Sequence, residues 1–239
     1  MLPCQAMRLI LLALALAFTP AAVIARSCPA PLANARKLVL VVPDTWASKT
    51  ARLQRFSRVA ANAPWQPQSG PESALIGRNG TGWSFAFRQF AFPDEPDKRE
   101  GDSRVPAGLF TIGRSFGFAP SARPGYLQIT SDTVCVSDAR HPLYNRIAAR
   151  GVIGPGVRAE SMRHVPEYAR GLLVNYPTRA GGGSCIFIHI RNPAAAGTSG
   201  CIALPEPELA TLQDFAQHGA VLAIVPKPAM ARFRGCLPQ

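Results

Sequence analysis

A histidine and a cysteine late in the chain have the residue types and spacing that nucleophilic catalysis needs. His189 lies near the end of an apolar run, and Cys201 follows a short segment of small residues. Only the thiolate form of a cysteine attacks a carbonyl carbon. A nearby imidazole can take the thiol proton as general base or stabilise the thiolate as an imidazolium. The pair therefore predicts acyl transfer through a thioester.

The residues directly before the cysteine suit the same chemistry. Gly200 has no Cβ atom, so the backbone N–H groups of Gly200 and Cys201 can approach a substrate carbonyl and stabilise an oxyanion. Thr198 and Ser199 precede them in the same turn, and we expect both to contact substrate. The alternative is purely structural, because a single histidine beside a strand or a cysteine in an apolar run usually belongs to the core.

The elements around this pair must bring it together. Residues Cys185 to Ile190 are rich in β-branched and aromatic side chains, which predicts a buried strand, and Arg191-Asn192-Pro193 ends it. The segment from Ala194 to Gly200 is small and flexible enough to fold back and place Cys201 beside His189. An earlier strand, Leu172 to Tyr176, is predicted to pair with the His189 strand as a hairpin.

Strands outnumber helices in the rest of the chain. Period-two and short apolar patterns predict further strands at residues 37–42, 53–59, 72–76, 109–112, 125–130, 133–136 and 220–225. One helix is predicted over Glu206 to Gln217, from its acidic first turn, its apolar stripe and the following Gly219. Short helices are expected at residues 145–150 and 159–164. With no internal repeat or long linker, the sequence predicts one mostly β domain with its core at about residues 37–225.

The charge balance indicates the kind of partner. The chain of 239 residues has 26 Lys and Arg against 14 Asp and Glu, a net charge of +12, which favours an anionic partner. The basic residues are scattered and do not alternate with aromatic residues, which argues against nucleic acid. An anionic polymer such as a cell wall, or an acidic membrane surface, fits better.

The first residues indicate export. Arg8 precedes an apolar stretch from Leu9 to Phe18, Thr19-Pro20 breaks it, and Ala25 offers a cleavage site, so residues 1–25 are predicted to be a signal peptide. The apolar stretch is short for a membrane span, although a retained signal anchor stays an alternative. The mature domain, residues 26–239, is then expected in the periplasm or cell envelope, with no integral membrane span.

The cysteine count fits that compartment. Six cysteines are present, and Cys4 would leave with the signal peptide, so five remain. An odd number in an oxidising compartment leaves one thiol unpaired, and the position of Cys201 in the turn makes it the expected one. Sequence does not fix the pairing of the others; Cys28 with Cys236 is the first choice and Cys135 with Cys185 the second. No CxxC motif occurs and the histidines are dispersed, so a zinc site is not expected.

A charged, turn-rich segment lies upstream of the residue 109–112 strand. It contains Lys98-Arg99-Glu100-Gly101-Asp102, then Arg104 and Pro106-Ala107-Gly108. Composition alone predicts a solvated loop. Such loops also form the rims of clefts, and Arg99 and Arg104 together could hold a substrate carboxylate in a fork.

These motifs together resemble a known family. His189, the Thr198–Ile202 motif and the upstream Lys98–Asp102 segment resemble L,D-transpeptidases of the YkuD type, of the ErfK/YbiS/YafK-like branch, over about residues 37–225. The resemblance implies a β-sandwich with a helix packed against it and no cofactor. It implies that Cys201 attacks the third residue of a peptidoglycan stem tetrapeptide and releases the terminal D-Ala, that His189 activates the thiol, and that Gly200 helps to bind the oxyanion. An amine of a neighbouring stem or of a lipoprotein lysine would then resolve the thioester.

The sequence also departs from the family pattern. Ser199 stands where most members have histidine, and Ala203 stands where most have arginine or asparagine. The loop after His189 is shorter than usual. The nucleophile and the base are both present, but two alternatives stay open. Water could be the acceptor in place of an amine, which would make the protein an L,D-carboxypeptidase. The chain could also be a non-catalytic cell-wall binding domain of the same fold. A papain-like peptidase is disfavoured because in that family the cysteine precedes the histidine, whereas here His189 precedes Cys201.

Overall fold

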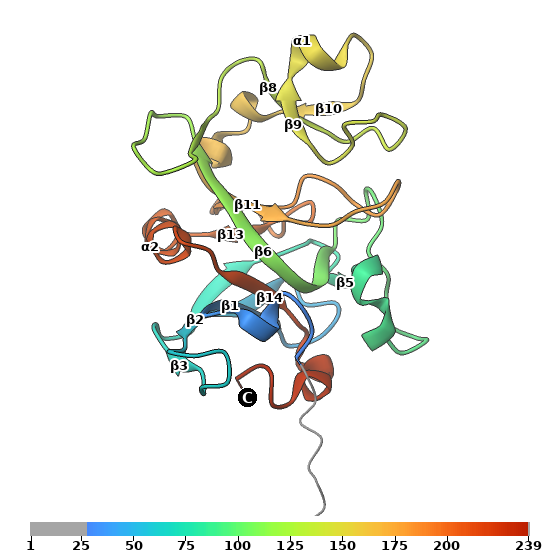
Figure 1. Cartoon of the computed structure of the whole chain (residues 1–239). Helices are drawn as coiled ribbons and strands as arrows, with labels where there is room; N and C mark the ends of the chain where they lie inside the picture. The colour runs from blue at the N-terminus through green and yellow to red at the C-terminus, as the bar shows by residue number, and fades with distance from the viewer. Residues whose placement is uncertain (1–27, 239) are drawn as a thin grey trace, which may run out of the picture.

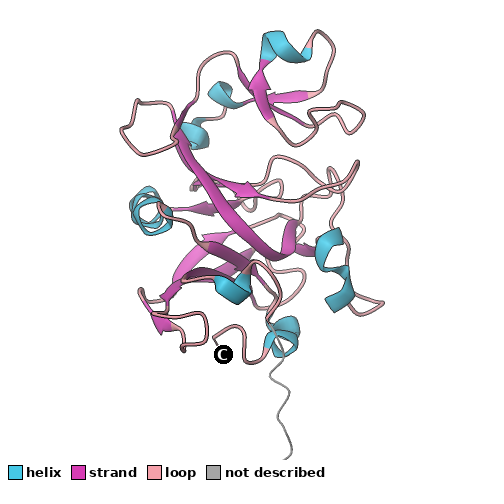
Figure 2. Ribbon diagram, viewed as in Figure 1, coloured by secondary structure: helices cyan, strands magenta, loops and turns pink. Residues whose placement is uncertain are grey.

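The computed structural model describes residues 28–238, and these are mostly β (Figures 1 and 2). The predicted signal peptide, its cleavage site and the alternative signal anchor lie outside the described residues. Within residues 28–238, the helices are all too short or too polar to cross a membrane.

The main sheet folds over on itself as a β-sandwich. Its strands run in the order β1-β14-β6-β11-β12-β13-β4-β2, and β1 also pairs with β2, so the path closes. The bounds of these strands are β1 (Lys37–Pro43), β2 (Thr50–Ser57), β4 (Glu72–Leu75), β6 (Val105–Gly117), β11 (Arg170–Asn175), β12 (Phe187–Ile190), β13 (Ile202–Leu204) and β14 (Val221–Ile224). Short strands β3 (Gln66–Pro67), β5 (Thr81–Trp83) and β7 (Leu127–Gln128) extend it. Closure leaves few unpaired strand edges.

Side chains along β12 alternate between the inner and the outer face of the sheet. Ile186 and Ile188 belong to the main core inside the sheet, whereas Phe187 belongs to a second cluster on the outer face. His189, two residues after Phe187, therefore also points outward, because side chains on a strand alternate between its faces.

A smaller unit covers that outer face, and we call it the lobe (residues 133–169). It has a three-stranded sheet in the order β10-β8-β9. Its elements are β8 (Thr133–Val136), β9 (Ile147–Ala149), α1 (Arg150–Ile153), β10 (Ala159–Ser161), η3 (Met162–His164) and η4 (Pro166–Ala169). Figure 1 shows it beyond the upper end of β6. Met162 and Tyr168 of the lobe pack against Phe116, Phe187 and Cys201 of the main sheet.

The strand predictions are confirmed, but two strands are clearly shorter than predicted. Residues 125–130 contribute only β7, and the strand predicted from Cys185 begins at Phe187, because Cys185 has a positive φ of 58°. The predicted hairpin is the antiparallel pair β11–β12. Helix α2 (Glu206–Ala216) matches its prediction. Elements without a sequence prediction are η1 (Leu32–Asn34), η2 (Phe85–Phe90), η4, η5 (Lys227–Phe233), β3, β5 and β13.

The two short predicted helices are wrong. Residues 145–150 form β9 and only the first residue of α1, and residues 159–164 form β10 followed by a single 3-10 turn. Both segments pair with β8, one on each side. Asn145 adopts a positive φ of 62°, which is incompatible with a right-handed helix. Pairing with β8 thus overrides the local helical pattern.

Both disulfide predictions are confirmed. Cys28 pairs with Cys236, which joins the two ends of the described chain, and Cys135 pairs with Cys185, which ties the lobe to the segment before β12. Among the described cysteines Cys201 alone is free.

A buried ion pair fastens η5 to the segment after β5. Arg232 Nη2 lies 2.6 Å from Glu95 Oε1, and Arg232 Nη1 lies 2.6 Å from Glu95 Oε2. Burial acts to raise the pKa of Glu95, but hydrogen bonds from Arg232, the Phe92 amide and the Trp83 indole outweigh it and lower the pKa to about 2. A lowered folded-state pKa stabilises the protein above the unfolded value, and that stabilisation is lost as the pH falls towards 2.

We therefore expect acid to destabilise the wild type more than Glu95→Gln. Between about pH 5 and pH 2, the free energy of unfolding measured in urea should fall by about 2 kcal/mol more in the wild type than in the variant. Asp214→Asn is the control, since its exposed pair with Arg123 is expected to contribute little. If the free energy of unfolding fell equally with pH in the wild type and in Glu95→Gln, the lowered pKa of Glu95 would be contradicted.

Candidate active site

The predicted nucleophile and base line one pocket. Strands β12 and β13 run parallel, with Ile188 opposite Ile202 and His189 opposite Ala203, so Cys201, just before β13, lies beside Phe187. The pocket has a volume of about 180 Å³ and lies on the outer face of the sheet. Its lining includes His189, Thr198, Ser199 and Cys201 from the main sheet and Glu160 and Tyr168 from the lobe.

The hydrogen bonding of His189 fixes its tautomer. Nδ1 lies 2.8 Å from the carbonyl oxygen of Ile190. A carbonyl only accepts hydrogen bonds, so Nδ1 carries the proton and Nε2 of the neutral ring is the free base. Burial lowers the pKa of His189, opposed by the Ile190 hydrogen bond and the charge of Glu167. The ring is therefore neutral at pH 7 and able to accept a proton.

Cys201 is held as a protonated thiol. Its Sγ accepts a hydrogen bond from the Phe187 amide and donates one to the Cys185 carbonyl, each at 3.4 Å. Burial raises the pKa of the thiol to about 12, and the charge of Glu160 adds to the rise. Within the described residues no hydrogen bond joins this thiol to His189. Proton transfer from the thiol to His189 thus requires a contact between the two groups that this structure does not contain.

Tyr168 packs against both groups, and it is not among the site residues predicted from sequence. Its ring lies edge-on to His189, with centroids 5.4 Å apart, and its hydroxyl donates to Glu160 Oε2 at 2.9 Å. Tyr168 also packs in one buried cluster with Cys201, and its hydroxyl acts to lower the pKa of that thiol. Tyr168 and Glu160 come from the irregular lobe segment, where no periodic pattern or spacing in the sequence marks them as partners of the thiol.

The turn before Cys201 is closed by Thr198. Its hydroxyl donates to the Cys201 carbonyl at 2.7 Å and accepts from the Gly200 amide at 3.1 Å. The second bond occupies the Gly200 N–H, which was expected to bind the oxyanion. Ser199 is exposed, and its hydroxyl accepts a hydrogen bond from Arg78 Nη2 at 2.7 Å.

Comparison with known families agrees with this geometry. The sequence matches the YkuD family, described as the L,D-transpeptidase catalytic domain, over residues 62–225, which is more than half of the chain. The chain belongs to the YkuD family. The comparison with curated proteins gives no match. Membership indicates activity of the L,D-transpeptidase type on peptidoglycan, and the two disulfides accord with an oxidising, exported environment.

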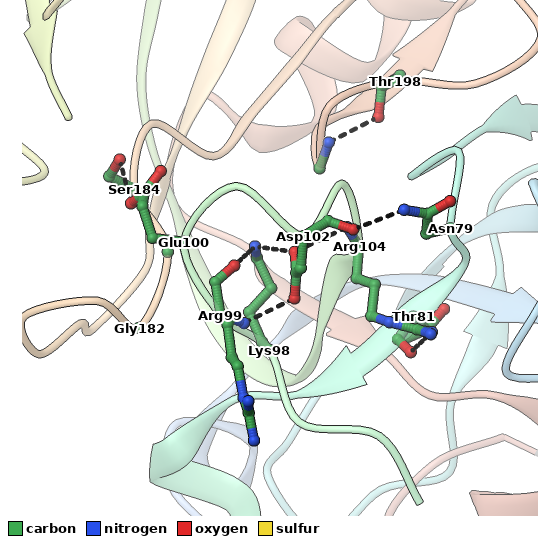
Figure 3. A network of polar contacts seen from close by, with 12 residues as sticks. Asn79, Thr81, Lys98, Arg99, Glu100, Asp102, Arg104, Gly182, Ser184 and Thr198 are labelled. Atoms are coloured by element: carbon green, nitrogen blue, oxygen red, sulfur yellow. Dashed lines mark hydrogen bonds and ion pairs between the residues drawn. The ribbon is translucent and has the colours of Figure 1, made fainter. Parts of the chain in front are cut away.

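The two arginines expected at the rim of the YkuD site lie elsewhere. Neither lines the pocket. Arg104 Nη1 donates to the Thr81 carbonyl at 3.1 Å, and Figure 3 shows the side chains of Arg99 and Arg104 pointing away from Thr198 and from each other. They form no fork in this structure. What Arg104 does contribute is its backbone, because its carbonyl lies against Gly200.

Within the described part of the chain, no three His, Cys, Asp or Glu side chains gather where they could hold a metal ion.

A methyl group at Gly200 should disturb the YkuD site. Gly200 has φ of 136°, and an added Cβ would lie 2.9 Å from the Arg104 carbonyl oxygen. We expect Gly200→Ala to cost about 1–3 kcal/mol of stability and to slow alkylation of Cys201, because the turn must shift. Gly70→Ala is the control, since an added Cβ there meets nothing within 4 Å. Thermal unfolding and thiol alkylation measure both effects, and equal values for the two variants would contradict them.

Proposed function

We propose that the protein is a peptidoglycan L,D-transpeptidase that forms a thioester on Cys201 and acts in the periplasm or cell envelope. The observation that carries the proposal is the pairing of a free thiol with a neutral His189, whose Nε2 is unprotonated, in one pocket of a YkuD domain. The predicted export signal and the two disulfides support the compartment.

The first half of the reaction uses these two side chains. As the stem tetrapeptide binds, Nε2 of His189 takes the Sγ proton, and the thiolate attacks the carbonyl carbon of the third stem residue. A C–S bond forms, and negative charge builds on the carbonyl oxygen. When the C–N bond to D-Ala breaks, the imidazolium returns the proton to the leaving nitrogen. The product is a thioester on Cys201 and free D-Ala.

The second half reverses the proton movements. An incoming amine gives a proton to His189 as its nitrogen attacks the thioester, and the C–S bond breaks to leave the thiolate, which is then reprotonated. Thr198, Ser199 and Gly200 border the nucleophile and are proposed to contact the donor peptide near the scissile bond. Of these, Ser199 is the most accessible, and Arg78 holds its hydroxyl in place.

The test is incubation with purified muropeptides that carry a tetrapeptide stem, followed by mass analysis of protein and products. We expect an adduct equal to the muropeptide minus D-Ala, mapped to Cys201, and a cross-linked product when an amine acceptor is present. An adduct that yields only trimmed tripeptide would assign the L,D-carboxypeptidase activity instead. Binding without any adduct or product would leave only a non-catalytic cell-wall domain and would overturn the proposal.

A further inference from the structure

A buried ammonium group organises the charged loop upstream of β6. Lys98 is only 7% exposed, yet its Nζ makes two short contacts, 2.6 Å to Asp102 Oδ1 and 2.6 Å to the Arg99 carbonyl (Figure 3). The Asp102 carboxylate also accepts the backbone amides of Arg99 and Arg104, at 2.6 and 2.9 Å. The loop is therefore a fixed structure built around one ion pair, and not the solvated loop that its composition predicts.

This loop contacts one backbone segment that carries the nucleophile. The backbone amide of Arg104 donates to Asp102, and the backbone carbonyl of the same residue lies against Gly200, the residue before Cys201. Displacing Asp102 would thus move the surface on which the Gly200–Cys201 turn rests.

The loop also contacts the segment that accepts the thiol proton. Lys98 Cε and Nζ would lie 2.8 and 3.0 Å from a Cβ added at Gly183, so the Lys98 side chain lies directly on this glycine. Glu100 accepts a hydrogen bond from Ser184 Oγ at 2.8 Å. The next residue is Cys185, whose carbonyl accepts the Cys201 thiol proton.

The charges around the thiol oppose one another. Glu160 on the lobe raises the pKa of Cys201 after the larger effect of burial, whereas Lys98 lowers it, as do the Phe187 amide and the Tyr168 hydroxyl. Three further titratable groups line the pocket: His189 on β12, Glu167 on the lobe and the exposed Arg78. Of these groups Lys98 is the buried cation, and charge in a poorly solvated site acts strongly on a forming anion.

We propose that Lys98 is a positioning residue for acylation: held by Asp102, it fixes the backbones on both sides of the Cys201 thiol, and its positive charge favours the thiolate. This inference rests on the proposed role of Cys201 as nucleophile. A stable ion pair alone would not require a lysine here, since buried pairs are often replaceable by apolar residues without loss of stability.

The test measures alkylation of Cys201 by iodoacetamide as a function of pH in the whole protein, with the modified residue identified by peptide mass. Lys98→Met should slow alkylation at fixed pH about tenfold or more and move the profile towards alkaline pH, since one pKa unit is a tenfold change in thiolate. Lys98→Arg keeps the charge and should stay within about threefold of the wild type. Asp102→Asn removes the neutralising partner and should move the profile in the opposite direction, towards acid pH.

Arg232→Met is the matched control, because it breaks another buried ion pair, neither member of which lines the pocket, and should lower thermal stability without moving the profile. A folded Lys98→Met protein with the wild-type profile would overturn the inference. If Lys98→Met does not fold, Asp102→Asn decides: a shift towards acid pH supports the inference, and no shift or an alkaline shift overturns it.

Alkylation requires no peptidoglycan, so this inference and the proposed function fail separately. A thiol that depends on Lys98 but is never acylated by a tetrapeptide would refute the function alone.

Discussion

Cys201→Ala is expected to abolish acylation completely. The variant lacks the atom that forms the thioester, and no other described cysteine is free to replace it. Incubation with a tetrapeptide muropeptide should give no protein adduct, and product formation should fall by at least about 10³-fold, the scale on which removing a catalytic nucleophile acts. The side chain is small and buried, so the fold should survive.

The informative comparison is with Cys201→Ser. A serine hydroxyl at this position keeps the hydrogen bonds to the Phe187 amide and the Cys185 carbonyl, but it is a far weaker nucleophile than a thiolate. Both variants should retain the wild-type circular dichroism spectrum. Turnover by either variant at a rate near that of the wild type would show that the protein acts without a thioester.

His189→Gln should reduce acylation by about 10² to 10⁴-fold, the usual contribution of a general base. Glutamine can still donate a hydrogen bond to the Ile190 carbonyl but cannot take the thiol proton. Because burial lowers the pKa of His189, the wild-type ring should remain a base at pH values below its ordinary 6.5, and acylation should decline only on the acid side of that value. The pH–rate profile of the wild type measures this.

His164→Gln provides the control for that experiment. His164 is exposed and does not line the pocket, so its replacement should leave the rate and the pH profile unchanged. If His189→Gln and His164→Gln behaved alike, His189 would have only a structural role.

The sequence predicts the part of the site that local patterns encode. The period of two along β12 places His189 on the face opposite Ile188, and the short Gly-rich return places Cys201 beside the same strand. The odd cysteine count predicts that one thiol stays free, the position of Cys201 in the turn indicates which one, and the positions of the others suggest both disulfides. Each of these features depends on residue type and spacing within a short stretch or on simple counting.

The rest depends on contacts between distant segments. Tyr168 reaches the thiol only because the lobe folds over the outer face of β12, and the Lys98–Asp102 pair reaches Gly200 only through the backbone of Arg104. The predicted fork of Arg99 and Arg104 is not formed for the same reason, because the Arg104 guanidinium donates to the carbonyl of Thr81, more than twenty residues earlier in the chain. Such pairings are set by sheet closure and side-chain packing, which leave no periodic signal.

The position of Cys185 has a consequence for oxidative folding. Its native partner, Cys135, is 50 residues away, whereas Cys201 is only 16 residues away, and in the folded protein the Cys201 sulfur already touches the Cys185 carbonyl. Shorter loops close at lower entropic cost, so a Cys185–Cys201 bond competes with the native one while the lobe is still unfolded. That bond would consume the proposed nucleophile. Wherever it forms, thiol–disulfide exchange must return Cys185 to Cys135 before the Cys201 thiol is free to react.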